Sequence, residues 1–307
     1  MPNARRAAAR RRRQRRRVVG WTLIAVAVAL AGGGVVLWLA TRSHDEAAST
    51  TASRVVAVRK HRQVSTPAVP LLHLPSRLPA RTIDLPILMY HRIDLVKPTL
   101  PAITQRLTVD PDEFAAEMLW LERHGYHAVS QLQAFDALEY GAPLPRKPIM
   151  ITFDDGYRDV LGKASPILER LHMPATAYVI TDRISGPDPS FLTWGNLRAL
   201  EQRGITIGSH TVHHVDLTLL SDAQALYELR ESREVLEREL GHPVQWFAYP
   251  LGDEDARIVA LVRQAGYVLA VTTQPGSLQS AADPLELHRY EVLDTTGVAG
   301  LAAMLGG

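Results

Sequence analysis

The segment PIMITFDDG, residues 148–156, decides the fold class of this chain. Its first six residues form an apolar, β-rich run, which ends at two adjacent aspartates and a glycine. Similar apolar runs recur further along the chain, and amphipathic stretches with helical periodicity alternate with them. Nearly continuous apolar strands that alternate with helices are typical of a parallel sheet covered by helices. The sequence therefore predicts an α/β fold with this segment as one of its buried strands.

The other predicted elements have recognisable ends. Ser130 with Gln133, and Ser221 with Gln224, have the spacing of helix capping boxes. Further strands are expected over residues 85–90, 175–180, 205–208, 244–249 and 267–271. Helices are expected over residues 110–124, 157–171, 194–202, 221–240 and 255–265.

Chemically active side chains follow two of the predicted strands. In parallel α/β folds the functional site lies at the carboxyl ends of the strands. Asp154 and Asp155 can act together only past the end of their strand, where Gly156 permits the chain to turn. His210 and His214, at i and i+4, share one face of a helical turn. Two imidazoles and one carboxylate suit a catalytic divalent metal such as Zn²⁺, and the second carboxylate is then available as a base.

Each motif has a plainer interpretation when it is taken alone. Asp-Asp-Gly is most often a turn, and His-x-x-x-His is often a surface turn. His213 could also replace either histidine as a ligand, because i, i+3 spacing works as well. The 307-residue chain has no cysteine, so any metal must be held by His, Asp or Glu. Both motifs at strand ends of one domain favour a metal site and metal-assisted hydrolysis.

The charge of the chain is unevenly distributed. Residues 1–17 hold nine arginines and no acid, and residues 42–81 have a net charge of +5. Residues 18–41 carry no charge, so the total of +2 leaves residues 82–307 with −12. A strongly acidic domain argues against a nucleic-acid partner.

The uncharged run, residues 18–41, is long enough to cross a bilayer as a helix. Trp21 and Trp38 lie near its ends, and the Arg-rich tail before it indicates a cytoplasmic N-terminus. A cleaved signal peptide is the alternative, although its apolar core is usually roughly 7–15 residues long. We expect a cytoplasmic tail over residues 1–17, a transmembrane signal anchor over 18–41, a Pro/Ser/Thr/Ala-rich linker over 42–81 and an extracytoplasmic domain over 82–307.

The domain resembles the polysaccharide deacetylases of carbohydrate esterase family 4, the NodB homology domain. Residues 152–156, TFDDG, match the first motif of that family, and residues 210–214, HTVHH, match the second. Residues 247–252, FAYPLG, resemble the third motif, and residues 86–93 resemble the opening strand of exported members. The resemblance covers about residues 83–295. It implies a distorted (β/α) barrel, a divalent metal that is usually zinc, and removal of acetyl groups from polysaccharides that contain N-acetylglucosamine.

The resemblance also assigns roles to the motif residues. Asp154 becomes the general base, which takes a proton from the attacking water, and Asp155, His210 and His214 become the metal ligands. The third motif makes the oxyanion and substrate site, which we assign to Tyr249, Pro250 and Leu251. In this assignment the backbone N–H of Leu251 holds the oxyanion.

The chain departs from the family in three places. After the proline of the third motif the family often has a tyrosine, whereas this chain has Leu251, which keeps the backbone N–H and loses the ring. Ala248 stands near a position where the family often has an arginine that orients the base. The last motif, LELHRYEV at residues 285–292, offers His288 as the acid that protonates the leaving amine. The same segment equally resembles a subgroup with arginine and no histidine, which makes Arg289 the matched residue. His91, at the end of the opening strand, is the third candidate for the acid side.

Together these observations predict a membrane-anchored, metal-dependent hydrolase that deacetylates N-acetylated or O-acetylated polysaccharide at or beyond the cell surface. One alternative keeps the metal and replaces the substrate by a small amide or imide. The other is a carbohydrate-binding module with a degenerate site. A tether suits a polymer that is fixed at the cell surface, and the intact set of metal ligands favours catalysis.

Overall fold

The computed structural model describes residues 69–75 and 80–306 of the chain. The predicted cytoplasmic tail, signal anchor and most of the linker lie outside these residues, so those assignments stay predictions. Within the described part of the chain, no helix combines the length and the apolar character that crossing a membrane requires. The deacetylase-like domain is described almost completely, and it carries all the candidate site residues.

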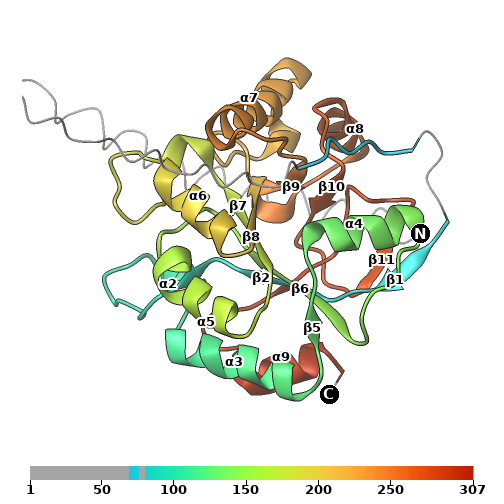
Figure 1. The fold of residues 1–307 in the computed structure, drawn as a ribbon. Helices are drawn as coiled ribbons and strands as arrows, with labels where there is room; N and C mark the ends of the chain where they lie inside the picture. The colour runs from blue at the N-terminus through green and yellow to red at the C-terminus, as the bar shows by residue number, and fades with distance from the viewer. Residues whose placement is uncertain (1–68, 76–79, 307) are drawn as a thin grey trace, which may run out of the picture. The chain divides into compact units, whose positions relative to one another are not determined.

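A parallel β-sheet forms the centre of the domain (Figure 1). Its strand order is β10-β9-β8-β7-β6-β2-β12, and β5 pairs with the first residues of β6. The strands are β2 Ile87–Tyr90, β5 His127–Ala128, β6 Pro148–Phe153, β7 Ala175–Val179, β8 Ile205–Ser209, β9 Trp246–Ala248, β10 Leu269–Val271 and β12 Tyr290–Glu291. Every pairing in this sheet is parallel, which confirms the predicted α/β class.

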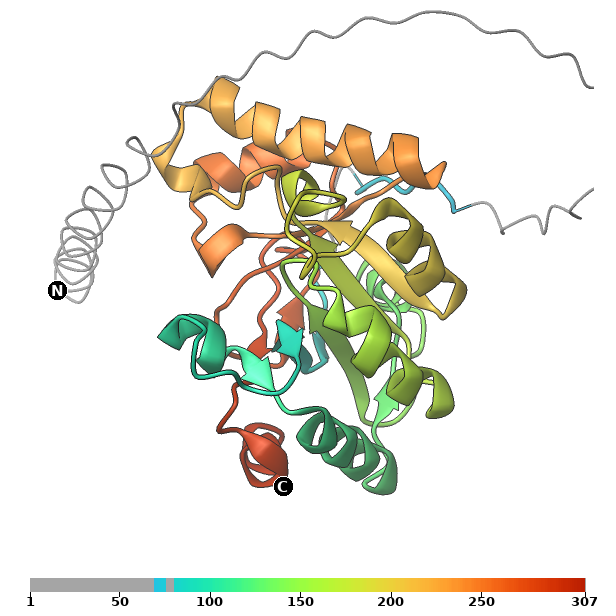
Figure 2. The ribbon, with the colours of Figure 1, turned by 90° about the vertical axis from the view of Figure 1, so that its left-hand side faces the viewer.

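Helices cover the sheet, with α7 along one side and α3 and α9 next to each other at the opposite end (Figures 1 and 2). The α-helices are α2 Ala102–Arg106, α3 Pro111–Arg123, α4 Gln131–Tyr140, α5 Ser165–Arg170, α6 Trp194–Gln202, α7 Asp222–Leu240, α8 Ala256–Gln264 and α9 Gly297–Met304. Both predicted capping boxes are present, at the start of α4 and of α7. Caps are local hydrogen bonds, so the sequence could specify these helix starts directly.

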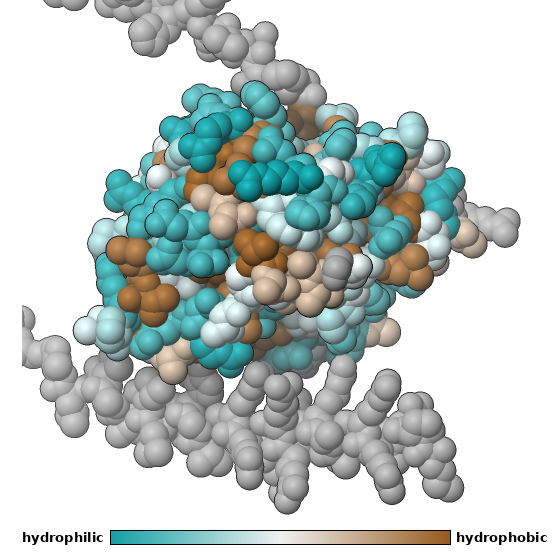
Figure 3. Space-filling model, turned by 90° about the horizontal axis from the view of Figure 1, so that it is seen from below, coloured by the Kyte–Doolittle hydropathy of each residue, from teal (hydrophilic) through white to brown (hydrophobic). Residues whose placement is uncertain are grey.

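Short elements complete the domain. Two pairs of strands flank the central sheet, β1 Thr82–Asp84 with β11 Leu278–Ser280 and β3 Arg92–Ile93 with β4 Thr108–Val109. The 3₁₀ turns are η2 Thr181–Arg183, η3 Leu217–Leu219 and η4 Pro250–Gly252, and η1 Val160–Ala164 is a π-helical turn. Seen from below, the described surface is mostly hydrophilic, and its hydrophobic patches are separated by polar residues (Figure 3).

The sheet is curved into a half-barrel whose two edges are joined by one short segment, residues 287–291. Leu287 forms a parallel bridge with Val271 of edge strand β10, and its carbonyl oxygen accepts the Thr272 N–H at 2.8 Å. Three residues later Tyr290 pairs with Leu88 of β2. The chain therefore crosses from one edge of the half-barrel to the other, and Arg289 lies in the middle of this crossing.

Several predicted strands are shorter at their ends in the structure, and two predicted segments differ in kind. The helix expected over residues 157–171 begins only at Val160, as the π-helical turn, and becomes α-helical at Ser165. Pro166 explains this difference, because its ring excludes the regular hydrogen bond to the preceding turn. Residues 69–75, which fall within the predicted linker, lie against the domain. The backbone of Leu72 donates to the side-chain amide of Gln245 at 2.8 Å and accepts from it at 2.7 Å.

Candidate metal centre and active site

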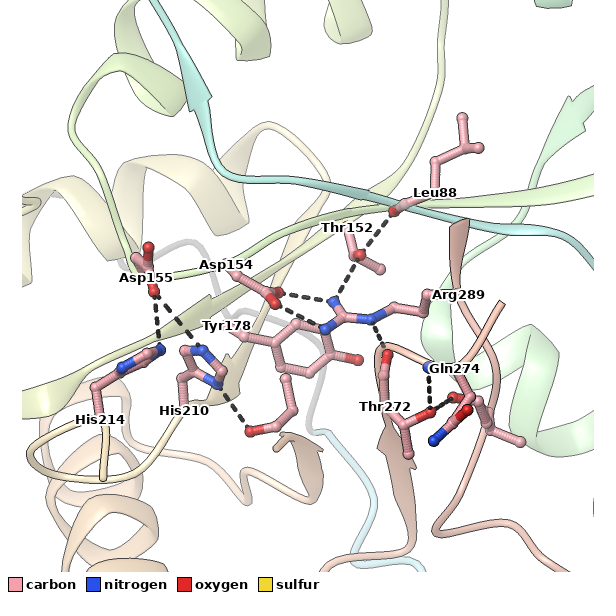
Figure 4. A network of polar contacts seen from close by, with 12 residues as sticks. Leu88, Thr152, Asp154, Asp155, Tyr178, His210, His214, Thr272, Gln274 and Arg289 are labelled. Atoms are coloured by element: carbon pink, nitrogen blue, oxygen red, sulfur yellow. Dashed lines mark hydrogen bonds and ion pairs between the residues drawn. The ribbon is translucent and has the colours of Figure 1, made fainter. Parts of the chain in front are cut away.

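Three potential metal ligands meet at the carboxyl end of the sheet. Asp155 follows β6, whereas His210 and His214 follow β8, two strands away. Asp155 Oδ1 lies 3.7 Å from His210 Nε2 and 3.5 Å from His214 Nε2 (Figure 4). The three ligand atoms all lie within 4.8 Å of one another. This donor set and its compactness fit a divalent cation with room for further ligands.

A hydrogen bond behind His210 fixes which of its nitrogens faces this site. His210 Nδ1 lies 2.8 Å from the carbonyl oxygen of Ala248. A carbonyl oxygen only accepts, so Nδ1 carries the hydrogen and Nε2 presents its lone pair toward Asp155. Burial lowers the pKa of His210 to about 3, and burial also lowers the pKa of His214. Both imidazoles are therefore neutral at neutral pH, as metal ligands must be.

The loop that carries these histidines is not the predicted helical turn. Thr211 and His214 have φ angles of 67° and 59°, in the left-handed region. The His214 N–H donates to Thr211 Oγ1 at 2.9 Å, so a side chain takes the place of the helical carbonyl acceptor. His213 Nδ1 lies 2.7 Å from Glu228 Oε1, which directs this third imidazole away from the metal cluster.

The candidate base, Asp154, is held by a buried arginine. Arg289 donates two parallel hydrogen bonds to the carboxylate, at 2.8 and 2.7 Å (Figure 4). The side chains of Arg289 and Asp154 are 0% and 3% exposed. Arg289 is held in turn by the Thr272 carbonyl oxygen at 2.8 Å and by Thr152 Oγ1 at 3.1 Å. Two hydrogen bonds of the guanidinium therefore fix the Asp154 carboxylate, and the other two hold the guanidinium itself in place.

This pairing decides the charge of Asp154. Burial alone would raise its pKa, but the charge of Arg289 and its hydrogen bonds outweigh burial and hold the pKa well below the usual range. Asp155 differs, because burial raises its pKa to about 6 and the charge of Asp154 adds to this effect. A cation beside Asp155 would offset both effects, which is a further sign that the site is built for one.

Sequence reasoning named Arg289 only as one of three candidates for the acid side. The structure instead places its guanidinium on the base. The useful signal was Ala248, which stands where the family often has the arginine that orients the base. In this chain Arg289 pairs with Asp154 instead, and it lies in the segment that joins the two edges of the sheet.

The proposed oxyanion residues lie just past β9. Leu251 has φ 60° and ψ −1°, a left-handed conformation, and its N–H has no acceptor among the described residues. Its side chain is 50% exposed, whereas Pro250 is buried. The Tyr249 ring is fully buried and packs edge-on against Phe247 at 5.1 Å, so it belongs to the core. Of these three residues Leu251 is the exposed one, and it lies three residues after Ala248, whose carbonyl holds His210.

The remaining candidates for the acid are His288 and His91. The His288 ring lies beside Gly276, its backbone is hydrogen-bonded on both sides to Gln279, and none of its described contacts reaches the metal ligands. His91 directly follows Tyr90 of β2, whose carbonyl oxygen accepts the Asp154 N–H at 2.9 Å. Its Nδ1 atom is buried without a hydrogen-bond partner among the described residues. The chain therefore places His91 next to the strand residue that is paired with Asp154, and the role of His288 stays a prediction.

Comparison with known proteins gives the same family as the motifs. The polysaccharide deacetylase family model matches residues 141–270, which include both aspartates and both ligand histidines. The "Putative polysaccharide deacetylase YxkH" of Bacillus subtilis is 32% identical over 218 residues, which cover 71% of this chain and 74% of that relative. A poly-beta-1,6-N-acetyl-D-glucosamine N-deacetylase of Staphylococcus epidermidis is 23% identical over 225 residues, 67% of this chain and 78% of that enzyme.

Among solved structures, the deacetylase PplD of Streptococcus pyogenes in complex with acetate is similar over 73% of this chain and 99% of its own, with 30% identity and a TM-score of 0.68. Sequence and fold thus agree over the same part of the molecule, the half-barrel that carries the metal ligands and the base. The chain belongs to the polysaccharide deacetylase family.

Proposed function

We propose that this protein is a metal-dependent deacetylase that removes acetyl groups from a polysaccharide containing N-acetylglucosamine, outside the cytoplasm. The observation that carries this proposal is the cluster of Asp155, His210 and His214 beside an Asp154 that Arg289 keeps ionised. A divalent metal, for which we favour Zn²⁺, would supply Lewis-acid polarisation of the acetyl carbonyl and a lowered pKa of water.

We assign proton transfer and binding of the oxyanion to residues of the protein itself. Asp154 accepts the proton of the attacking water, and Arg289 holds its carboxylate in one orientation during that transfer. The Leu251 N–H donates to the oxyanion that forms when the carbonyl is attacked. His91 gives a proton to the leaving amine, because it directly follows the strand residue whose carbonyl accepts the Asp154 N–H, and because Arg289 is engaged by Asp154, Thr152 and Thr272. We propose His91 for this step in preference to His288, whose ring lies beside Gly276.

A polymeric substrate has two lines of support. The relative from Staphylococcus epidermidis is named for deacetylation of poly-beta-1,6-N-acetyl-D-glucosamine, and the similar structure of PplD contains acetate, the expected product. The apolar run at residues 18–41 supports an anchored enzyme that faces the cell surface. A small amide or imide would need no anchor.

The test is acetate release by the full-length protein, measured together with its metal content. Acetylated peptidoglycan, poly-β-1,6-N-acetylglucosamine and chitin oligomers would be compared with a small aryl amide. Acetate release from at least one polymer, and its loss on treatment with a chelator, is the expected result. Binding of a polymer without acetate release by the metal-loaded protein would show a carbohydrate-binding module instead. Turnover of the small amide alone would favour an amidase.

A further inference from the structure

Helix α7 presents a buried carboxylate to the metal centre. The buried residues of this helix are apolar or small except for Glu228 and Ser232, which lie one turn apart. Glu228 is 6% exposed, yet the described residues give it no lysine or arginine partner. A buried carboxylate without such a partner is unfavourable unless hydrogen bonds compensate it. The groups that compensate Glu228 belong to the loop that carries the candidate metal ligands.

Three donors of that loop converge on Glu228. Its Oε2 atom accepts the N–H groups of Val212 and His213, both at 3.0 Å. Its Oε1 atom lies 2.7 Å from His213 Nδ1. Val212 and His213 are the two residues directly before His214, so the carboxylate fixes the backbone that enters this ligand.

The loop needs such a partner because its own conformation is unfavourable. Thr211 and His214 both adopt left-handed φ angles, which cost energy for residues with a Cβ atom. The loop carbonyls are satisfied from the other side, where the Thr181 and Asp182 N–H groups donate to Thr211 and Val212 at 3.2 and 3.1 Å. The N–H groups of Val212 and His213 also need acceptors, and the Glu228 carboxylate provides them.

The second polar residue of α7 acts at the other ligand. Ser232 Oγ lies 2.7 Å from Ser209 Oγ, and Ser209 directly precedes His210. Ser209 Oγ also accepts the Thr211 N–H at 3.3 Å. One buried strip of α7 therefore contacts the chain immediately before each of the two histidines.

We propose that Glu228 is a positioning residue that holds the Thr211–His214 loop in the conformation in which His210 and His214 bind the metal together. The inference rests on the proposed metal-dependent function. It predicts that metal affinity depends on a residue that does not itself touch the metal. Groups behind metal ligands typically change affinity about 10–100-fold when they are removed.

The test compares full-length Glu228→Ala, Glu228→Gln and Glu234→Ala in a zinc competition assay with a chelating dye. Glu234 is the control, because it is exposed on the same helix. We expect Glu228→Ala to weaken zinc binding at least about 10-fold. Glu228→Gln keeps one oxygen for the two N–H groups and should weaken binding less. Glu234→Ala should match the wild type, and equal zinc affinity of Glu228→Ala and the wild type would overturn the proposal.

Two further measurements separate positioning from folding and from a failed metal site. Hydrogen exchange of the Val212 and His213 amides, followed in the metal-free protein, should quicken in Glu228→Gln, because a neutral amide oxygen accepts the two N–H groups more weakly than a carboxylate does. The thermal unfolding midpoint should stay close to that of the wild type. Unchanged exchange at these amides would refute the role even if Glu228→Ala did not fold. If the wild type bound no divalent metal, the proposed function would fail, and the exchange result would still decide whether Glu228 orders the loop.

Discussion

Two buried carboxyl groups, Asp154 after β6 and Glu117 of α3, have pKa values that are shifted in opposite directions. Asp154, at the metal end of the half-barrel, is paired bidentately with Arg289, which holds its pKa well below the usual range. Glu117 of α3 is fully buried, and its described hydrogen bond comes from the Tyr90 hydroxyl at 2.8 Å. Burial raises the pKa of Glu117 to about 7.

The difference teaches that burial beside a single neutral donor raises the pKa of a carboxyl group, whereas a buried cation keeps the pKa of Asp154 low. A phenol supplies one hydrogen bond and no charge, so it opposes the effect of burial only weakly. A guanidinium supplies two hydrogen bonds and a full charge in one plane. Arg289, the cation that pairs with Asp154, lies 135 residues further along the sequence. Among the described residues no lysine or arginine side chain pairs with Glu117 in this way.

The largest expected effect is on catalysis, and it separates the two carboxyl groups by role. Asp154→Asn keeps the size of the side chain and removes the base, so acetate release should fall by at least about 10²-fold. Metal content should stay close to that of the wild type, because the residues proposed to hold the metal are Asp155, His210 and His214. Glu117→Gln is the matched control, since it removes a buried carboxyl group outside the site. Undiminished acetate release by Asp154→Asn would contradict the role of base.

The next effect is on stability and comes from breaking the buried ion pair. Arg289→Met leaves Asp154 buried without its cation, which should cost about 3–5 kcal/mol in the free energy of unfolding. Urea denaturation of the variant, compared with wild type, measures this cost. The double variant Arg289→Met with Asp154→Asn should recover part of the lost stability, because no charge then remains unpaired. A single variant as stable as the wild type would show that Asp154 does not depend on Arg289.

The third prediction concerns the pH dependence of stability that Glu117 adds. Its pKa in the folded protein, about 7, is above its ordinary value of 4.5, so the folded state binds its proton more tightly. Its stabilising contribution is complete below pH 4.5 and is lost as the pH rises to about 7. Glu117→Gln cannot titrate. The stability of this variant relative to wild type should therefore rise by up to about 3 kcal/mol between pH 4.5 and 8. Urea denaturation across this range measures the difference, and a constant difference would contradict it.

The sequence predicted the elements and ligands whose causes are local. The apolar run before Asp154, and the serines that begin α4 and α7, act on residues within one or two turns. Asp155, His210 and His214 could be brought together because carboxyl ends of parallel strands share one edge of a sheet.

What the sequence could not predict depends on contacts between distant segments. Arg289 reaches Asp154 because residues 287–291 join both edges of the sheet, and this crossing has no local signal in the sequence. The irregular path of the Thr211–His214 loop depends on Glu228, which lies in the following helix. The raised pKa of Glu117 has no local signal in the sequence, because the burial of this side chain comes from packing of α3 against the sheet.

The smallest effect tests how much a single hydrogen bond contributes at Glu117. Tyr90→Phe keeps the ring that packs edge-on against Phe114 at 5.2 Å and removes only the hydroxyl. Loss of this bond should cost about 1 kcal/mol at pH 5, where Glu117 is protonated. The cost should be larger at pH 8, because the ionised carboxylate then loses the only donor described for it. Urea denaturation at both pH values provides the measurement. An equal cost at pH 5 and 8 would mean that Glu117 does not change its charge between them, and the contrast with Asp154 would then rest on hydrogen bonds rather than on charge.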